Sequence, residues 1–364
     1  MSSQLKVNSI SDAAGANGNA ITLATDGTCT AKVTNNLSNR NLIINGSMQI
    51  AQRGTSSTSS GMNTVDRWNP QFAGTDEAIT QAQADVTADS DPWNKGFRKC
   101  LKLTNGNQTG GAGATDHSRI YYVIEAQDLA CSGWDYTSSS SYITFSFWVK
   151  SSVAQNFYGY LLTDDGTAQR YAFETGSLTA DTWTKVTKKI PGNSSITVNN
   201  DNGQGMYIFL WPFIPTDYTA SGTALDTWAA YASGTRTPDA TSTWWTTNDA
   251  TFELTGVQLE VGDVATDFEH RLYGDELLRC QRYYQKITGN KIVIMGDYNN
   301  STSNFWGQID LRTTMRAAPT VTVTAHAGGG TITNYSNPDT LSFNTSTGAA
   351  HFDNSTTIEA ASEL

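Results

Sequence analysis

Aromatic side chains are the residues of this chain best suited to recognise a ligand. The 364 residues include 10 Trp, 15 Tyr and 13 Phe. Such rings can stack on the C–H faces of sugars, while Asn, Asp and Gln side chains bind the hydroxyl groups. The alternative for every ring is packing in a core or a subunit interface. The candidate glycan platforms are Trp228, Tyr231, Trp244 and Trp245 in a long loop, and Tyr298, Phe305, Trp306 and Tyr335 near the C-terminus.

Carboxylates are the second group that could do chemistry. Glycoside hydrolysis needs two of them at a fixed separation in space, which no local motif encodes. We interpret the acidic residues around the strongest strand pattern as solvated strand and turn positions, and we predict no catalytic residue and no enzyme. These residues are Glu253, Glu260, Asp263, Asp267 and Glu269.

A structural calcium ion is an alternative role for some of these oxygens. Calcium prefers carboxylate and carbonyl ligands, but no EF-hand-type loop is present. We therefore predict no cofactor, with calcium kept as an alternative. Its candidate donors are Asp164, Asp165, Glu260 and Asp263.

The sequence lacks the motifs of other common catalytic and binding sites. The 4 His have no metal-ligand spacing, and the 4 Cys form no C-x-x-C pair, so the thiols are expected to be free and buried. There is no Walker loop and no G-x-S-x-G sequence. A net charge of −11 opposes nucleic-acid binding, and no apolar run is long enough for membrane insertion. We expect synthesis and assembly in a cytosol.

Strands must position these residues. Period-two alternation predicts strands at 99–103, 120–124, 142–150, 156–162, 169–173, 183–190 and 206–211. In the strand at 142–150, Ile143, Phe145, Phe147 and Val149 face one side. With the other strands expected before Phe252, these make roughly eight to ten strands in all. That number predicts a mainly β chain whose residues 40–272 form a jelly-roll β-sandwich.

Three local signals refine this prediction. Alternation in 252–261 changes parity at Thr255-Gly256, which predicts a β-bulge that keeps one face inward. Asn45-Gly46 predicts a hairpin-type turn. Pro212 and Pro215 predict that no central strand continues directly after Trp211.

The spacing of four residues after the sandwich predicts a helix. Steps of three, four and three residues place them on one stripe of a helix over 274–287, about four turns long. The helix lies in a connecting segment, 273–288, and its stripe should pack on the sandwich or on symmetry mates. The candidate trimer contacts are Leu277, Cys280, Tyr284 and Ile287.

Two terminal segments flank these parts. Residues 289–364 carry a renewed strand pattern at 292–295, 305–311, 321–325, 341–344 and 350–353, which predicts a small C-terminal β domain. Residues 1–39 are too short and too poor in apolar residues to form a core alone. We expect a partner to order them, and a frayed tail is the alternative.

Several phrases of the chain resemble a group of bacteriophage tail-fibre proteins. They lie at 41–54, 65–68, 254–262, 265–269, 273–277, 280–284, 315–321 and 363–364. The central region, notably 178–183, is similar to carbohydrate-binding jelly rolls. The tail-fibre resemblance implies a homotrimer located in the virion and attached to the phage tail or an adaptor through its N-terminus. It supplies no defined ligand residues.

These observations lead to one expectation and two alternatives. We expect a trimeric tail fibre that attaches to a host cell by binding a surface glycan or protein, with residues 289–364 as its tip. Three copies would make weak binding sites effective through avidity. The alternatives are a polysaccharide-degrading tailspike enzyme and a purely structural virion decoration or adaptor protein.

Overall fold

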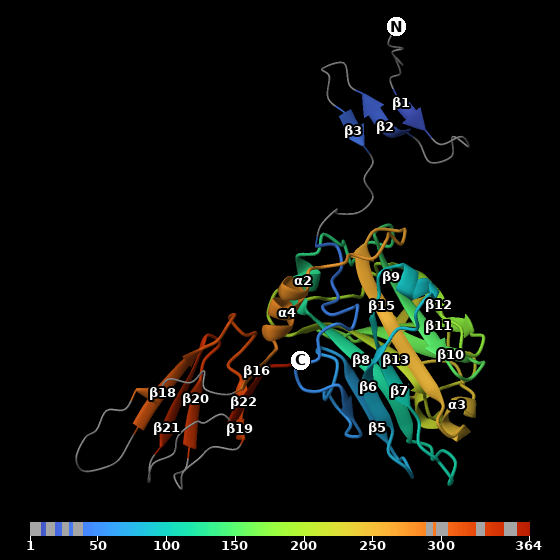
Figure 1. Cartoon of the computed structure of the whole chain (residues 1–364). Coiled ribbons are helices and arrows are strands. Elements are labelled where there is room, and N and C mark those ends of the chain that lie inside the picture. Colours follow the sequence, from blue (N-terminus) through green and yellow to red (C-terminus); the bar gives the residue numbers. More distant parts are fainter. Residues whose placement is uncertain are drawn as a thin grey trace.

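The chain folds mainly into antiparallel β-strands (Figure 1). The computed structural model describes residues 39–288, 305–324, 332–345 and 355–364, and short strands at 9–11, 19–23, 29–31 and 294–295. Two six-stranded sheets pack face to face and enclose the main core. The prediction of a mainly β chain built on a β-sandwich is confirmed.

The first sheet has the strand order β14-β11-β10-β13-β8-β5, and the second has the order β12-β9-β15-β7-β6-β4. The strands of the first sheet are β5 (Asn69–Ala73), β8 (His117–Glu125), β10 (Asn156–Thr163), β11 (Gln169–Ser177), β13 (Gln204–Phe213) and β14 (Trp228–Ala230). Those of the second are β4 (Ser56–Ser57), β6 (Thr80–Asp85), β7 (Lys99–Thr104), β9 (Tyr142–Ser151), β12 (Thr184–Pro191) and β15 (Thr251–Val261). All seven strands whose ranges were predicted before Phe252 are present.

Strand β9 shows how alternation builds the core. Its residues Ile143, Phe145, Phe147 and Val149 are fully buried between the sheets, as their spacing predicts. β9 lies between β12 and β15, so both of its edges are hydrogen-bonded.

The predicted bulge in β15 is confirmed. The register with β9 shifts between Thr255 and Gln258, and Gly256 has a φ of 61°. Leu254 and Val257, which differ in parity, are therefore both fully buried. A glycine suits this position because side-chain residues rarely adopt a positive φ.

The prediction for Pro212 is wrong. β13 continues to Phe213 in the middle of the first sheet, and its register with β8 shifts between Leu210 and Phe213. A proline cannot donate a ladder hydrogen bond, and the irregularity at this point accommodates it.

The predicted helix is too long. Helix α4 spans Tyr273–Gln281, and the chain then enters strand β16 (Tyr284–Thr288), which pairs with β22 (Thr357–Ala361). The partner strand comes from some seventy residues further along the chain. A helix-like spacing of apolar residues could not reveal this pairing, because the spacing is a local property.

The remaining helical elements are short. They are α1 (Asp91–Asn94), α2 (Ala126–Ala130), α3 (Thr243–Thr246), and the 3-10 turns η1 (Thr216–Tyr218) and η2 (Ser233–Thr235). Within the described ranges, every helix is too short or too polar to cross a bilayer.

Two small sheets follow α4. One has the order β16-β22-β19 and the other β17-β18-β21-β20, with β17 (Ile294–Met295), β18 (Phe305–Asp310), β19 (Thr320–Thr324), β20 (Ile332–Ser336) and β21 (Thr340–Thr345). They enclose a second, smaller core. The strand predicted at 350–353 lies outside the described residues.

Three strands precede the sandwich. β1 (Ser9–Ser11), β2 (Asn19–Leu23) and β3 (Cys29–Ala31) form an antiparallel sheet in this order. Whether a partner orders residues 1–39 stays a prediction.

Residues 41–54, 65–68, 280–284 and 363–364 meet at one junction between the sandwich and α4. Asn45 is fully buried there in a left-handed turn, and its side chain bonds the backbone of Ile50 and of Asp66. The flanking residues 41–54 are not strands, so the predicted turn forms but no hairpin surrounds it. The Arg67 guanidinium lies 3.4 Å from the centre of the Tyr283 ring and binds the carboxylate of Glu363 at 2.5 Å. The end of the chain thus returns to this junction (Figure 1).

Gly46 at this junction allows a close backbone approach. A Cβ atom at Gly46 would lie 2.1 Å from the Val257 carbonyl oxygen, and the Val257 amide donates to the Gly46 carbonyl at 2.9 Å. Gly46→Ala must therefore displace β15, and we expect it to lower the free energy of unfolding by about 3 kcal/mol. Urea denaturation measures this loss. The control is Gly274→Ala, where no neighbour lies within 4 Å and no loss is expected. Equal midpoints for both variants would contradict the close approach.

Candidate ligand-binding face

The long loop does not present its tryptophans to solvent. Trp244 and Trp245 on α3 are fully buried, and their indole N–H groups donate to the carbonyls of Thr251 and Gly111, both at 3.1 Å. Trp228 is buried as well and donates to the Pro191 carbonyl at 2.7 Å. The prediction of glycan platforms at these three residues is wrong, because packing and an internal hydrogen bond occupy each ring.

Two of the other predicted platforms are described in full. Tyr231 is half-buried and packs on the outward side of the first sheet, and Tyr335 on β20 is 53% exposed. Tyr298 lies outside the described residues. The side chains of Phe305 and Trp306 are also outside them, although the backbone of β18 is described.

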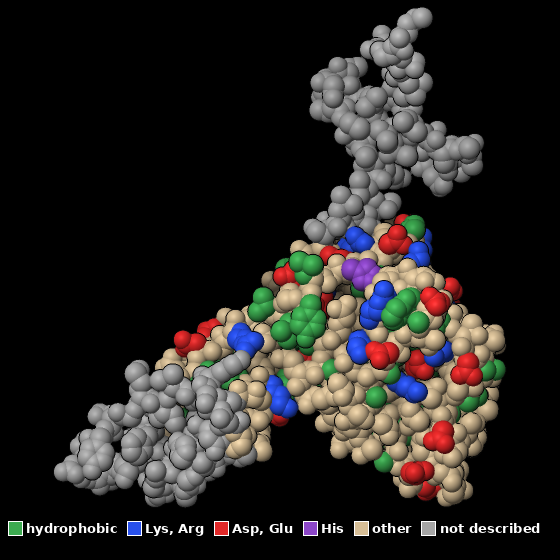
Figure 2. Space-filling view, in the orientation of Figure 1, with side chains coloured by type: hydrophobic (Ala, Val, Ile, Leu, Met, Phe, Trp, Pro, Cys, Tyr) green, Lys and Arg blue, Asp and Glu red, His purple; other side chains and the backbone are tan. Residues whose placement is uncertain are grey.

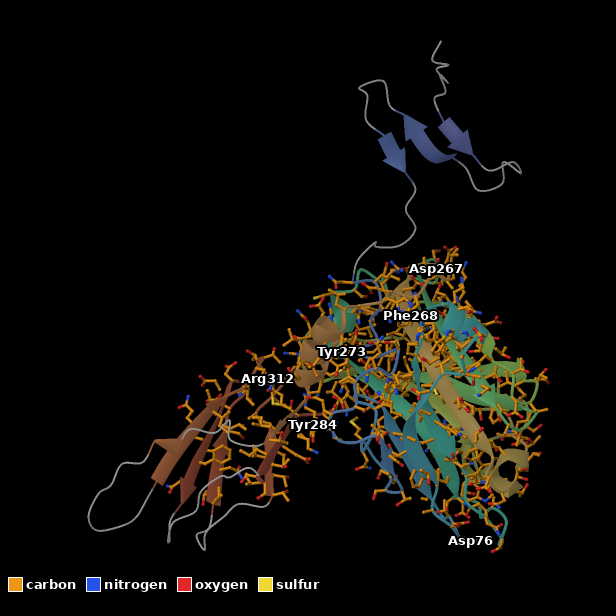
Figure 3. The ribbon with its side chains drawn as sticks, in the orientation of Figure 1. Asp76, Asp267, Phe268, Tyr273, Tyr284 and Arg312 are labelled. Carbon is orange, nitrogen blue, oxygen red and sulfur yellow. The ribbon has the colours of Figure 1, made fainter. Side chains whose placement is uncertain are left out.

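The residues of the predicted trimer stripe pack against other parts of the same subunit. Cys280 and the half-buried Leu277 pack with Ile44 and Ile50, and Tyr284 is buried beneath the Arg53 guanidinium. Ile287 belongs to the C-terminal core. The prediction that this stripe meets symmetry mates is therefore corrected for the buried Cys280, Tyr284 and Ile287. Figure 3 shows Tyr284 at the boundary between the sandwich and the small sheets.

The acidic residues around β15 have structural partners. Glu253 and Glu260 are buried and not solvated, which corrects our interpretation of these two positions. Glu253 pairs with Lys150 at 3.0 Å, and Glu260 accepts hydrogen bonds from the amide and hydroxyl of Thr266 at 2.8 and 2.6 Å. Their polar neighbours make burial of these carboxylates tolerable.

The four candidate calcium donors are not gathered. Asp165 accepts from the Asn199 amide at 2.8 Å, and Asp263 pairs with Lys189 at 3.2 Å. In the described part of the chain, no three His, Cys, Asp or Glu side chains come together in a way that would hold a metal ion.

The structure instead assembles rings on the outward side of the first sheet. We call this surface the aromatic face, made of Tyr121 on β8, Tyr160 on β10, and Tyr207, Phe209 and Trp211 on β13. These residues alternate with core residues such as Ile120, Ile208 and Leu210, so the pleat of the strands sends them away from the core.

Cross-strand register aligns three of these rings in a row. Phe209 lies directly opposite Tyr121 on one side and Tyr160 on the other. The ring centres of Tyr121 and Phe209 are 5.5 Å apart, and those of Phe209 and Tyr160 are 4.5 Å apart. Along β13, Tyr207 is stacked with Phe209 at 5.7 Å. The spacing falls in the range of favourable aromatic pairs.

The rings differ in their access to solvent. Tyr160, Phe209 and Trp211 are buried, whereas Tyr121 and Tyr207 are half-buried and reach the surface. Asn69 donates to the Tyr121 hydroxyl at 2.6 Å, which adds an amide beside the exposed rings. Burial raises the pKa of Tyr121, although Arg119 opposes the shift, so its hydroxyl stays protonated at neutral pH. A ligand can therefore contact the exposed rings of Tyr121 and Tyr207 and the neighbouring polar groups at the same time.

Residues 214–240, which we call the cover segment, lie over the other end of the aromatic face. Tyr218, Leu225 and Tyr231 pack against its rings. The amides of Asp226 and Tyr231 donate to the carbonyls of Ala172 and Ala168, both at 2.8 Å, and fix the segment to β11 and the turn before it. The aromatic residues of the long loop thus extend the face rather than protrude from it.

Three arginines converge here from separate parts of the chain. The Arg119 Cζ atom on β8 lies 5.5 Å from the centre of the Trp211 ring, and the Arg236 Cζ atom in the cover segment lies 5.8 Å from it. Arg170 on β11 donates to the Arg236 carbonyl at 3.1 Å. Burial lowers the pKa of Arg119 and that of Arg170, but guanidinium groups remain charged at neutral pH.

His117 borders the same group of cations. Its ring packs against Trp211 at 5.9 Å and Tyr218 at 6.3 Å. Burial is the main cause that lowers its pKa, and the charges of Arg119 and Arg236 add to the effect. The imidazole is therefore neutral at pH 7, and the positive charge of this region comes from the arginines.

A hollow lies on the outward side of the second sheet. It is a cleft of about 350 Å³ whose lining includes Trp148, Lys185, Asp267, Phe268 and His270. Figure 3 labels Asp267 and Phe268 next to each other on this side, and Figure 2 shows basic and hydrophobic side chains there. Phe268 packs edge-on against Phe97 at 4.8 Å. The cleft has no row of rings across adjacent strands, so the aromatic face is the stronger candidate.

One signal in the sequence could have revealed the aromatic face. In 206–211, Met206, Ile208 and Leu210 alternate with Tyr207, Phe209 and Trp211, so both faces of this strand are apolar. A strand with an aromatic outward face needs a cover or a ligand. The arginines carry no such signal, because they lie up to 117 positions apart in the chain.

Comparisons with known proteins found similar solved structures only. No family model matches the chain, and no curated protein matches it. A tailspike protein 4 enzymatically active domain from bacteriophage CBA120 is 11% identical over 61% of this chain, with a TM-score of 0.32, and the chain spans only 21% of that protein's length. The N-terminal cellulose-binding domain of Cellulomonas fimi β-1,4-glucanase C is 10% identical over 60% of this chain and 100% of its own, with a TM-score of 0.28. A family 11 carbohydrate-binding module from Clostridium thermocellum is 10% identical over 58% of this chain and 98% of its own, with a TM-score of 0.26. At these TM-scores the likenesses assign neither a family nor a ligand, and the function must be argued from the chain's own residues.

Proposed function

We propose that this chain is a glycan-binding attachment protein without enzymatic activity. The observation that carries the proposal is the row of Tyr121, Phe209 and Tyr160 across three adjacent strands, on a side of the sheet that faces away from the core. Tyr207 and Tyr121 reach the surface and offer ring faces for sugars, and Asn69, Gln71 and Arg119 offer polar groups beside them.

The setting we propose is the tail fibre of a bacteriophage, assembled in the host cytoplasm and carried in the virion. Support comes from the shared phrases of the sequence, which the fold brings together at the junction of Asn45, Arg67 and Glu363. In this setting the N-terminal segment attaches to the phage tail or an adaptor, and the aromatic face meets a surface glycan of the host.

A homotrimer remains part of this proposal. The exposed large hydrophobic side chains of the α4 region, which could contact another subunit, are Leu272, Tyr273 and Leu278. Avidity from three copies would raise the binding of a weak site. Light scattering of the full chain measures the assembly, and a monomer would remove this part of the proposal.

Replacing the exposed rings tests the binding face. We expect Tyr121→Ala and Tyr207→Ala each to weaken binding to the recognised glycan by about tenfold, since each removes a stacking surface. Binding is measured on an array of bacterial polysaccharides and on host cells. The matched control is Tyr335→Ala, which removes an exposed tyrosine from β20. Loss of binding in the control, with full binding in the other two variants, would move the site to the C-terminal sheets and refute the proposal.

The same preparation tests the absence of catalysis. Incubation with a bound polysaccharide should release no oligosaccharide. Release of defined fragments would instead support a polysaccharide-degrading tailspike.

A further inference from the structure

The arginines beside the aromatic face lack the carboxylate partner that several other arginines of the chain have. At the junction, Arg67 binds Glu363, and Arg282, at the C-terminal end of α4, binds both oxygens of Glu125 at 2.8 Å. Within the described ranges, no carboxylate lies within ion-pair distance of Arg119, Arg170 or Arg236. The chain has 34 acidic and 23 basic residues, so the lack of a carboxylate here does not follow from a shortage of acidic residues.

Three buried N–H donors at this place also have no acceptor among the described residues. They are Nε of Arg170, Nε of Arg236 and Nε1 of Trp211. Arg170 is 4% exposed and Trp211 is 1% exposed, so the fold itself shields these groups from bulk water. Buried donors are almost always paired in folded proteins, because an unpaired donor is costly.

The cations also act on one another. Both Arg119 and Arg236 approach the Trp211 ring within 6 Å, and the charge of Arg236 contributes to a lowered pKa of Arg119. Holding like charges together in a partly buried place is unfavourable unless a negative charge joins them.

Two of the three cations are partly exposed near a ring on which a sugar could stack. Arg119 and Arg236 are half-buried, and the Arg119 Cζ atom lies 5.6 Å from the centre of the Tyr121 ring. Arg170 lies deeper and adds its charge from beneath. Nε and Nη2 of Arg119 donate to Gln71 Oε1, so an anion would meet the other N–H groups of Arg119 and those of Arg236. Guanidinium groups form strong charge-assisted hydrogen bonds with carboxylate and phosphate oxygens.

We propose that the aromatic face binds an acidic saccharide, whose carboxylate or phosphate group meets Arg119 and Arg236 while a sugar ring stacks on Tyr121 or Tyr207. This inference rests on the proposed glycan-binding function and specifies its ligand class. The anionic group neutralises positive charge that no carboxylate of the described residues offsets.

The test uses the full chain and an array that carries neutral and acidic bacterial polysaccharides. Wild-type protein should bind acidic polysaccharides and leave neutral ones unbound. Two chemical treatments of a bound polysaccharide identify its anionic group. Reduction of carboxyl groups to alcohols abolishes binding if the group is a carboxylate, and removal of phosphate with hydrofluoric acid abolishes it if the group is a phosphate.

Variants of the arginines locate the anion. Arg119→Gln and Arg236→Gln should each weaken binding to the acidic polysaccharide by about tenfold, because each removes a charge-assisted hydrogen bond. The matched control is Arg98→Gln, an exposed arginine whose Cζ atom lies 3.8 Å from the centre of the Trp93 ring on the other side of the sandwich. Its binding should equal that of the wild type. The treated polysaccharides test the wild-type protein directly, so the result does not depend on the folding of any variant.

The outcomes separate this inference from the function on which it rests. Binding to neutral polysaccharides alone, or equal binding before and after both treatments, would overturn the inference and leave glycan binding intact. Acidic polysaccharides that bind Arg119→Gln and Arg236→Gln as tightly as wild type would overturn it too, since the anion would then lie elsewhere. Binding to no polysaccharide would overturn both.

Discussion

Glu363→Ala should lower the free energy of unfolding by about 3 to 5 kcal/mol, because it leaves the Arg67 guanidinium buried without its anion. Arg67 is 1% exposed, and its other partners include the Val123 carbonyl at 2.7 Å and the rings of Tyr283 and Tyr122. A carbonyl and a ring do not replace a carboxylate, so the charge would remain uncompensated.

Chemical denaturation of the full chain measures this effect. Glu359→Ala is the matched control, since Glu359 pairs with Lys286 at 3.5 Å and both side chains are partly exposed. Such a pair contributes less than about 1 kcal/mol. The double variant Arg67→Met with Glu363→Ala should recover part of the loss, because it removes the buried charge as well. A loss in Glu363→Ala no greater than in Glu359→Ala would contradict the role of this pair.

The last residues of the chain also connect the small C-terminal sheets to the rest of the protein. Arg316 donates to the carbonyls of Ser362 and Glu363 at 2.8 and 3.2 Å, and Leu364 packs on the α4 cluster. The last residues of the chain therefore bind the sandwich, α4 and the segment before β19. We infer that the junction stabilises the arrangement of the sandwich and the sheets that follow it.

Asp66→Asn should change how stability depends on pH. Asp66 is 1% exposed, and burial raises its pKa from 3.8 to about 6, although hydrogen bonds from Gln52 and the charge of Arg53 oppose the shift. Between these two pKa values the folded state keeps a proton that the unfolded state has released. The contribution of Asp66 is therefore fully present below about pH 4 and is lost as the pH rises through about 6. Relative to Asp66→Asn, the wild type should lose roughly 3 kcal/mol over this range.

The measurement is the difference in unfolding free energy between wild type and Asp66→Asn, taken at steps across the same pH range. The control Asp239→Asn removes an exposed carboxylate from the cover segment, and its difference from wild type should stay nearly constant. A difference for Asp66→Asn that is flat, or that grows in favour of the wild type as the pH rises, would show that burial does not govern this carboxyl.

The candidate site shows where local patterns stop being informative. Trp244, Trp245 and Tyr231 share a long loop and look alike in sequence, yet the first two fill the core and the third lies on the aromatic face. Exposure of a ring depends on what packs over it, and the partners are distant in the chain: the carbonyl that binds Trp245 belongs to Gly111. Helix α4 likewise ends at Gln281, earlier than its apolar spacing predicts. The residues that follow it form β16, which pairs with the distant residues 357–361.

The β class, most strands of the sandwich, the inward face of β9 and the bulge at Thr255-Gly256 could all be predicted from the sequence. These features follow from the two-residue repeat of a strand and from the conformational freedom of glycine, which are properties of neighbouring residues. The row of Tyr121, Tyr160 and Phe209, and the meeting of Arg119, Arg170 and Arg236 beside it, depend on the folded structure. Strand register and the course of the cover segment bring together residues from β8, β10, β11 and β13, and no local pattern encodes which distant strands will pair.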